Sequence, residues 1–300
     1  MRTDTSAVVD LDGPTHYADF GGPAGAAPLV AVHGLGGSHA NWVAVAPRLA
    51  ADHRVLALDL AGHGLTRPDH RRTDVDANQA LLNRFLREVV AEPAVLMGNS
   101  MGGLISILQA SRHPQTVSAL VLLDPAIPGP RLRHDRQVML RFAGFGVPGL
   151  GAALMTRRRH RLSPRQQVQE LLDLCCVDSA RVPVDAVDRH VELAAQRQSF
   201  PGLERAFLDA ARSVMLKLAL HERLMSHMRA VDVPVLLLHG EQDRLVPAQA
   251  ARRAAHRHPG WHVEIAPGLG HVPQLEAPDW TVNTYRRWRA SLSVPSAHEE

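Results

Sequence analysis

The sequence predicts an α/β fold in which a mostly parallel central sheet is flanked by helices and interrupted by an inserted helical segment. Short apolar runs of strand length alternate with helical patterns before residue 128 and again after residue 230. This alternation is typical of a parallel sheet covered on both faces. Between these two parts, about a hundred residues have helical periodicity and no apolar run typical of a strand.

One interrupted domain fits this pattern better than two domains in tandem. We expect residues 1–127 and 231–300 to form the two parts of the α/β core, and residues 128–230 to form a helical cap or lid. The chain has 300 residues, of which 45% are hydrophobic and 21% charged. Such a chain can bury a large core without disulfides or metal.

Six apolar runs predict strands that are buried on both faces, as in a parallel sheet. They are expected at residues 28–33, 54–60, 94–98, 117–123, 233–238 and 261–265. The segment 7–20 has Gly13-Pro14 in its middle, which predicts a hairpin at the edge of the sheet.

Helical periodicity fills most of the remaining chain. In the core, helices are expected at 40–51, 74–91, 101–112, 247–258 and 278–292. The helix at 74–91 has Leu82, Phe85 and Val89 on one apolar face, and Thr73 or Asp74 can cap its first turn. In the insertion, helices are expected at 131–143, 164–177, 184–197 and 202–229, with prolines as breaks.

Residues 98–102 read Gly-Asn-Ser-Met-Gly, which matches the pattern G-x-S-x-G. The pattern is weak alone, but here it lies between a predicted strand and a predicted helix, where a nucleophile elbow requires it. Glycines at both ends remove the Cβ atoms that would clash in so sharp a turn. The helix N-terminus also favours developing negative charge. Ser100 is therefore the candidate nucleophile.

A serine hydroxyl needs a base to take its proton. The chain has 18 histidines, and His271 is favoured because it lies in a glycine-rich loop after the strand predicted at 261–265. The acid that orients the histidine should also follow a strand. Asp243 does so after 233–238, while Asp124 at the end of 117–123 is its competitor and Glu241 is less favoured. In the chain the three candidates occur in the order Ser100, Asp243, His271, which is one of the orders known for catalytic triads of serine, acid and histidine.

The segment His33-Gly-Leu-Gly-Gly37 follows the first buried strand. Its glycines would let the loop fold against the nucleophile with a backbone N–H pointing inward. The backbone N–H groups of Leu35 and Met101 are the expected donors of an oxyanion hole. His33 is expected to brace the loop by hydrogen bonding rather than to act as a base.

Five segments together resemble the α/β-hydrolase superfamily, in particular its capped serine hydrolases. They are HGLGG (33–37), DLAGHGLT (59–66), GNSMGG (98–103), GEQDRLVP (240–247) and GLGHVPQLEAP (268–278). The resemblance covers most of residues 28–290 outside the cap. It implies that Ser100 attacks, that His271 is general base and then general acid, and that Asp243 orients the imidazole. It also implies a covalent acyl-enzyme intermediate and neither a metal nor an organic cofactor.

The serine nucleophile disfavours the epoxide hydrolases and haloalkane dehalogenases of this superfamily, which attack with aspartate. The elbow GNSMGG resembles that of hydrolases that cleave carbon–carbon bonds in aromatic ring-cleavage products. Those enzymes usually have tryptophan after the catalytic histidine, where this chain has Val272. Arginines in the cap could still bind a dienoate carboxylate: Arg131, Arg133, Arg136 and Arg141.

We therefore expect a carboxylic ester hydrolase (EC 3.1.1 type) for short to medium acyl chains. The alternatives are a carbon–carbon bond hydrolase, an acyltransferase or perhydrolase, and a non-catalytic ligand-binding homologue. An apolar segment of the cap, 142–155, could form a lid or a pocket wall. The substrate-binding candidates are Gly34, Gly36, Phe142, Phe145 and Val272.

The expected partner is a small-molecule ester. The formal net charge of +3 comes from arginine-rich composition, with Lys217 the single lysine, and does not indicate a nucleic-acid surface. Cys175 and Cys176 are adjacent, which disfavours a disulfide scaffold. No signal peptide and no apolar run of about 20 residues is visible, so we expect a cytoplasmic protein without stable membrane insertion. The oligomeric state is left open.

Overall fold

Eight strands form one sheet in the part of the chain that this computed structural model describes, residues 4–129, 156–157, 159 and 161–292. The strands are β1 (Thr5–Asp10), β2 (Pro14–Asp19), β3 (Pro28–Val32), β4 (Arg54–Leu58), β5 (Ala94–Asn99), β6 (Val117–Leu123), β7 (Val235–Gly240) and β8 (His262–Ala266). Their order across the sheet is β1-β2-β4-β3-β5-β6-β7-β8. From β4 to β8 all neighbours are parallel, whereas β2 pairs antiparallel with both β1 and β4.

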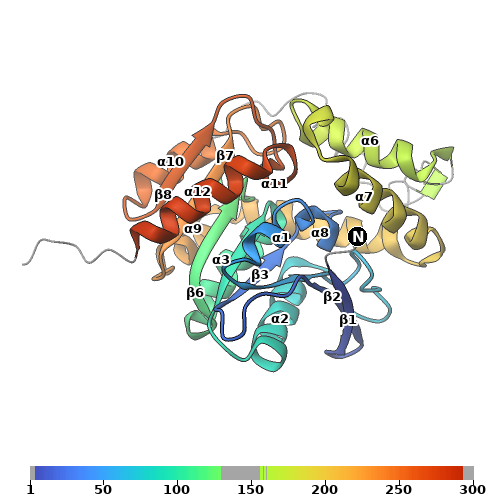
Figure 1. Ribbon diagram of the computed structural model, residues 1–300, viewed down its shortest axis with the longest axis horizontal. Coiled ribbons are helices and arrows are strands. Elements are labelled where there is room, and N and C mark those ends of the chain that lie inside the picture. Colours follow the sequence, from blue (N-terminus) through green and yellow to red (C-terminus); the bar gives the residue numbers. More distant parts are fainter. Residues whose placement is uncertain (1–3, 130–155, 158, 160, 293–300) are drawn as a thin grey trace, which may run out of the picture.

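The predicted α/β architecture and the N-terminal hairpin are confirmed (Figure 1). The hairpin lies at the sheet edge and turns through Asp12 and Gly13, both with positive φ. The strand predicted at 117–123 has the bounds found for β6, and the others agree to within two residues. Each strand is encoded by its own apolar run, so its position in the sequence can be predicted without knowing the order of the strands in the sheet.

Helices lie on both faces of the sheet. In the core they are η1 (His39–Trp42), α1 (Ala46–Leu49), α2 (Val75–Phe85), η2 (Leu86–Val90), α3 (Met101–Arg112), η3 (Pro114–Thr116), α10 (Gln249–Arg257), α11 (Pro273–Glu276) and α12 (Pro278–Ser291). The single helix predicted at 40–51 is wrong, because this stretch forms η1 and α1 instead. Ser38 caps η1 and Pro47 lies at the start of α1, so two local signals begin two short helices.

Alternate residues of each buried strand pack on opposite faces. On β3, Val30 and Val32 face the cluster that contains α2, α3 and α10, while Leu29 and Ala31 face the cluster that contains α1 and α12. Both clusters are almost entirely buried. Each face buries its own apolar side chains, so the sheet is held as the middle layer of three.

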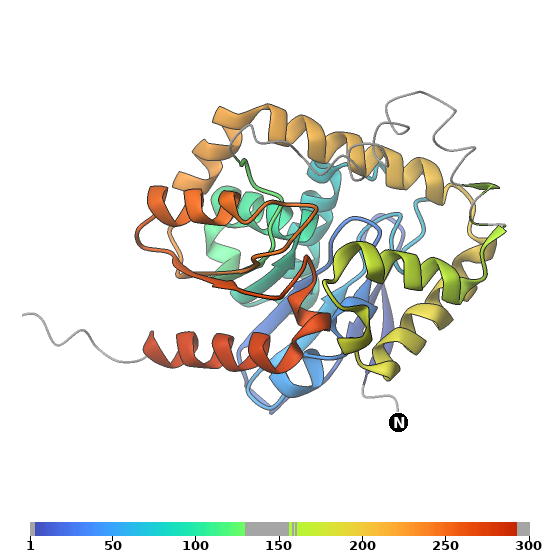
Figure 2. The same cartoon turned by 90° about the horizontal axis from the view of Figure 1, so that it is seen from above.

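Between β6 and β7 the described helices are α6 (Pro164–Cys175), η5 (Ser179–Arg181), α7 (Val184–Gln196), η6 (Arg197–Ser199), α8 (Leu203–Ala219) and α9 (His221–Arg229). Figure 2 shows α6 and α7 at one side of the sheet and α8 running as a long helix across the molecule. The stretch 202–229, predicted as one helix, breaks at Leu220, whose ψ is 49°. The helix predicted at 131–143 lies outside the described residues.

The last of these helices, α9, packs against α3 of the core through Leu224, Met225 and Met228. In contrast, α6 and α7 form a separate apolar cluster with Val272 and Leu275, which follow the loop that carries His271. The segment between β6 and β7 therefore contacts the core in several places, and α8 adds further contacts with α2.

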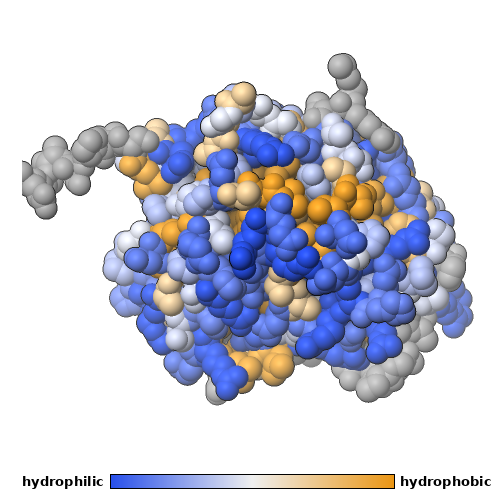
Figure 3. All heavy atoms as spheres, turned by 90° about the horizontal axis from the view of Figure 1, so that it is seen from below, coloured by the Kyte–Doolittle hydropathy of each residue, from blue (hydrophilic) through white to orange (hydrophobic). Residues whose placement is uncertain are grey.

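Apolar side chains of the described residues are mostly buried. On the face seen from below, hydrophobic residues form a band among hydrophilic ones (Figure 3). In the described parts of the chain, no helix combines the length and the apolar character needed to cross a membrane.

Candidate active site

Strand β5 passes into helix α3 through a single residue, Ser100. Its backbone has φ 52° and ψ −116°, a strained conformation for a residue with a side chain. The flanking glycines permit it. A Cβ on Gly98 would lie 2.6 Å from the Gly102 carbonyl oxygen, and one on Gly102 would lie 2.0 Å from that of Val32. The predicted elbow is therefore present, with Ser100 at its apex.

The glycine-rich loop after β3 lies against this elbow. A Cβ on Gly34 would come within 3.1 Å of the Cβ of Ser100. The backbone N–H groups of Leu35 and Met101 have no hydrogen-bond acceptor among the described residues. Within the described part of the chain, two backbone donors thus have no partner on the two segments that meet at Ser100.

His33 holds the base of this loop. Its Nδ1 donates to the Gly34 carbonyl oxygen at 2.8 Å, and its Nε2 accepts from the Leu60 N–H at 3.1 Å. Burial lowers the pKa of His33 to about 4. Both ring nitrogens are occupied and the ring is neutral, so His33 braces the loop as expected.

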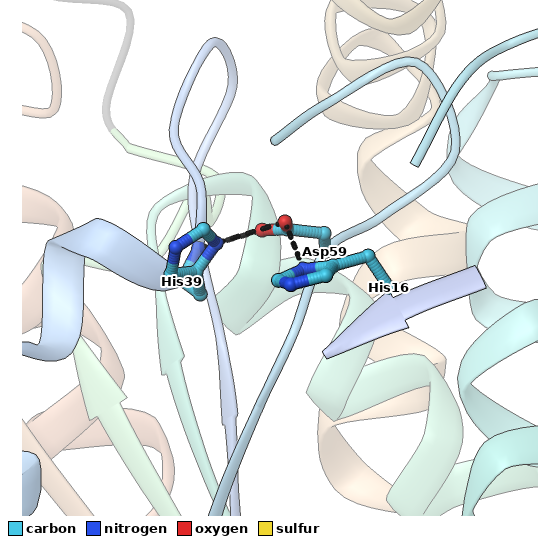
Figure 4. A group of neighbouring side chains, drawn as sticks. All are labelled: His16, His39 and Asp59. Atoms are coloured by element: carbon cyan, nitrogen blue, oxygen red, sulfur yellow. Dashed lines mark hydrogen bonds and ion pairs between the residues drawn. The ribbon is translucent and has the colours of Figure 1, made fainter. Parts of the chain in front are cut away.

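A second set of contacts fixes the neighbouring loop, which follows β4 (Figure 4). The carboxylate of Asp59 accepts hydrogen bonds from Nδ1 of His16 at 2.7 Å and Nδ1 of His39 at 2.9 Å. It also accepts from the backbone N–H groups of His39 and Leu65. Burial alone would raise the pKa of Asp59, but the two histidines outweigh it and hold the pKa well below its usual range. Sequence reasoning gave no role to this network, although Asp59 follows an apolar strand and begins the segment 59–66 that carries part of the family resemblance.

These three residues do not have the spacing of a metal site. Ligand atoms of a tetrahedral zinc site lie about 3.3 Å apart, given metal–ligand distances of about 2.0 Å. Here both Nδ1 atoms lie within hydrogen-bond distance of the same Asp59 oxygen, and this distance requires a proton between the atoms.

Asp243 and His271 form a close pair at the ends of β7 and β8. Oδ2 of Asp243 accepts from Nδ1 of His271 at 2.7 Å, and its Oδ1 accepts from the backbone N–H groups of Leu245 and Val246. Both residues are buried. Burial would raise the pKa of Asp243, but the nearby His271 and its hydrogen bond lower it below the usual value.

The other two acids considered from the sequence lie differently. Asp124 is fully buried and accepts from the Gly240 N–H at 2.8 Å, but it has no hydrogen bond to His271. Glu241 lies at the surface and pairs with Arg252. Of the three, Asp243 is the acid in contact with His271.

The loop that carries His271 is tied to both the elbow and the insertion. The side-chain amide of Asn99 donates to the His271 carbonyl oxygen at 3.0 Å, and the His271 N–H donates to the Cys175 carbonyl oxygen at 2.6 Å. Asn99 directly precedes Ser100, and Cys175 ends α6. The backbone of His271 is thus fixed on two sides by residues that sequence reasoning did not single out.

Glu276 strengthens the contact with the insertion. Its buried carboxylate accepts from the Gly270 N–H through Oε2 and from the Val177 and Asp178 N–H groups through Oε1. One side chain therefore joins the segment before His271 to the segment after α6.

The structure describes some of the remaining predicted site residues, and others lie outside the described part of the chain. No hydrogen bond joins Ser100 Oγ to the imidazole of His271 among the described residues; such contacts are often long until substrate binds. A Cβ on Gly36 would lie 3.1 Å from the ring of Phe207 on α8. Val272 packs in the apolar cluster of the insertion. Phe142, Phe145 and the arginines at 131, 133, 136 and 141 lie outside the described residues.

Residues 29–284 match the model of the alpha/beta hydrolase family. The fold and the nucleophile elbow described above are typical of the same family, and the chain belongs to it. Among solved structures, a putative lipase from Acinetobacter baumannii has the same fold, with a TM-score of 0.77, 20% identity, and coverage of 97% of this chain and 92% of that one.

Three curated relatives have different names. The dihydrolipoyllysine-residue acetyltransferase component of the acetoin cleaving system of Pseudomonas putida is 32% identical over 87% of this chain and 62% of its own length. A human monoacylglycerol lipase is 24% identical over 92% and 79%. The 2-hydroxymuconate semialdehyde hydrolase of a Pseudomonas species is 29% identical over 83% and 82%. The chain spans slightly less than two thirds of the first two relatives matched.

Proposed function

We propose that this protein hydrolyses carboxylic esters of short to medium acyl chain through Ser100, His271 and Asp243. The observation that carries the proposal is the 2.7 Å contact between Asp243 and His271, on a loop tied by Asn99 to the strained elbow of Ser100. A serine nucleophile needs a base and an acid that orients the base, and the contact between Asp243 and His271 supplies the second of these relationships.

In the first half of the reaction, Ser100 Oγ attacks the carbonyl carbon of the ester while Nε2 of His271 takes the hydroxyl proton. Nδ1 keeps its own proton, because it donates to Asp243. The carbonyl oxygen gains negative charge and is stabilised by the N–H groups of Leu35 and Met101. When the tetrahedral intermediate collapses, His271 returns the proton to the departing alcohol and the acyl group remains on Ser100.

In the second half, His271 takes a proton from water, and the resulting hydroxide attacks the acyl carbon. The same two N–H groups stabilise the second intermediate. The carboxylic acid leaves as the proton returns to Ser100 Oγ. The residues supply nucleophile, base and charge stabilisation, so this scheme calls on no cofactor.

The insertion, residues 128–230 as predicted, is proposed to act as a cap that shapes the acyl pocket. The contacts of His271 with Cys175 and of Glu276 with the segment after α6 support a position beside the catalytic groups. Location in the cytoplasm stays a prediction from the sequence.

The second candidate is hydrolysis of a carbon–carbon bond in a ring-cleavage product. It is supported by the 2-hydroxymuconate semialdehyde hydrolase among the relatives and by the resemblance of the elbow. The ester hydrolase is preferred because Val272 follows His271, where tryptophan is usual in the carbon–carbon hydrolases, and because lipases are also among the relatives.

Hydrolysis of p-nitrophenyl esters from acetate to palmitate, by the wild type beside Ser100→Ala, tests the proposal. Turnover that is lost in the variant, with an optimum at short or medium chains, is the expected result. Folded wild-type protein that hydrolyses none of the esters would overturn it, and a ring-cleavage dienoate would then be the next substrate. Acyl transfer is tested in the same assay by adding alcohols or peroxide as acceptors and analysing the products.

A further inference from the structure

The buried carboxyl groups of Asp124 and Asp243 lie close together, and that of Asp243 contacts His271. Asp124 follows β6 and Asp243 follows β7, and these two strands are neighbours in the sheet. Neither side chain is exposed to solvent. One oxygen of each carboxyl and a ring nitrogen of His239 lie within 4.8 Å of one another. The proposed catalytic acid therefore has a second buried acid within 4.8 Å.

Their hydrogen bonds are unequal. Asp243 accepts from three donors: His271 Nδ1 and the N–H groups of Leu245 and Val246. Asp124 accepts from one donor, the Gly240 N–H, and its Oδ2 is buried with no donor among the described residues. Three donors stabilise a carboxylate far better than one, so Asp243 is the carboxyl that carries the negative charge.

His239 supplies neither a hydrogen bond nor a positive charge to the Asp124 carboxyl group. Its Nε2 lies 3.6 Å from an oxygen of each aspartate, beyond hydrogen-bond distance, and donates instead to the Val246 carbonyl oxygen at 2.9 Å. Burial lowers the pKa of His239, so this ring stays neutral. Two carboxylates in such a site cannot both be ionised.

The backbone of Asp124 is also unusual. Its φ is 43°, in the left-handed region that residues other than glycine seldom adopt, although aspartate and asparagine tolerate it. Such outliers persist where the surrounding structure fixes them, and they gather at functional sites. Here the left-handed residue lies at the end of β6, and its side chain lies beside the proposed acid.

We propose that Asp124 is protonated and donates a hydrogen bond from Oδ2 to Asp243, which holds the Asp243 carboxylate ionised and aimed at His271. Asp124 is thus a positioning residue for the triad, and the proposal rests on the ester hydrolase proposed above. Burial and the nearby Asp243 both raise the pKa of Asp124 well above its usual value. Besides Asp243, the titratable groups whose charges act on this site include His271, His239, Glu276 and Cys175.

The acidic limb of the pH profile of kcat/KM separates a protonated from an ionised Asp124. That limb reports the proton on the catalytic base. If Asp124 is already neutral, Asp124→Asn removes no charge and keeps a donor, so the limb stays in place and kcat/KM falls by less than about fivefold. If Asp124 is ionised, the substitution removes a negative charge near His271 and the limb moves down by about one pH unit or more, which would overturn the proposal.

Asp124→Gly tests the positioning role, because glycine also accepts a positive φ but removes the donor. We expect kcat to fall by about tenfold or more, with a smaller change in KM, since the Asp243 carboxylate loses a buried hydrogen-bond donor. Wild-type kcat in this variant would contradict the role. Glu241→Gln is the matched control: it removes a carboxylate from the residue next to Gly240, but at the surface.

Two measurements without turnover keep the proposal testable if no ester is cleaved. Infrared spectra of aspartate-labelled protein should contain a protonated carboxyl C=O band that disappears in Asp124→Asn and remains in Ser100→Ala; the absence of the band refutes the protonated state. Proton NMR at low pH should show the downfield His271 Nδ1–H resonance, shifted in Asp124→Gly and unchanged in Glu241→Gln. An unshifted resonance in Asp124→Gly refutes the positioning role.

Discussion

The side-chain amide of Asn99 donates to the backbone carbonyl of His271 at 3.0 Å and also to that of Leu123 at 3.0 Å. Asn99 is the last residue of β5, and it lies beside Ser100 in the chain. A single buried amide therefore fixes the distance between the segment that carries the proposed nucleophile and the loop that carries the proposed base.

Replacement of Asn99 by alanine should loosen this connection. Both carbonyl groups lose their donor, so we expect kcat to fall by about tenfold and the free energy of unfolding by about 1–3 kcal/mol. Ester kinetics and urea unfolding measure the two effects. Asn283→Ala, at an exposed site on α12, is the control. If Asn99→Ala turned over substrate at the wild-type rate, the amide would not set the geometry of the site.

Replacement of Asp243 by asparagine should leave the fold and ligand binding near normal while kcat falls by about two to four orders of magnitude. The asparagine amide can no longer hold the histidine in the tautomer that accepts a proton at Nε2. Steady-state kinetics and the affinity for a product acid give the comparison. A loss of that size in Asp124→Asn, but not in Asp243→Asn, would show that Asp124 is the catalytic acid.

Replacement of Ser100 by glycine should abolish ester hydrolysis and stabilise the protein. The φ of 52° and ψ of −116° at this position are costly for serine but accessible to glycine. We expect the free energy of unfolding to rise by about 1 kcal/mol, measured by urea denaturation. Ser106→Gly, at a buried helical position of α3 where the hydroxyl donates to the Gly102 carbonyl oxygen, should instead destabilise the protein. Destabilisation by Ser100→Gly would mean that the elbow carries no strain.

The buried histidines His33 and His63, at the glycine-rich loop after β3, should make the free energy of unfolding depend on pH. Burial lowers the pKa of His33 to about 4 and that of His63 to about 3, against a usual value of 6.5. Below pH 6.5 the unfolded chain binds protons that these folded-state rings do not, so stability falls as the pH drops from 6.5 toward 4. Each ring contributes at most about 1.4 kcal/mol per pH unit.

Urea unfolding of the wild type and His33→Gln between pH 7 and pH 4.5 measures this slope. Glutamine retains an acceptor for the Leu60 N–H but does not titrate, so the variant should lose less stability on acidification. His256→Gln, at an exposed position, should keep the wild-type slope. Equal slopes in the wild type and His33→Gln would show that His33 is not buried as a neutral ring.

The local pattern of the sequence was sufficient for most elements. The apolar run 117–123 and the helical stretch 101–112 were predicted with the bounds of β6 and α3, because each is encoded by its own periodicity and end signals. The nucleophile elbow could be located for the same reason, since strand, glycines and helix are contiguous. The stretch 202–229 shows the limit of this reasoning: its periodicity is continuous, yet the helix breaks at Leu220 and the following helix α9 packs against α3.

The sequence alone determined the α/β class, the position of Ser100 on its elbow and the small set of acids that follow strands. The sequence favoured Asp243 over Asp124 as the acid, but only the tertiary structure brought Asp243 into contact with His271, and only it joined His16 and His39 to Asp59. Each of these pairs lies on segments that are distant in the chain, and which partner a buried polar atom finds is decided when strands take their order in the sheet. Apolar periodicity does not encode that choice, because it specifies which side of an element is buried and not what it meets there.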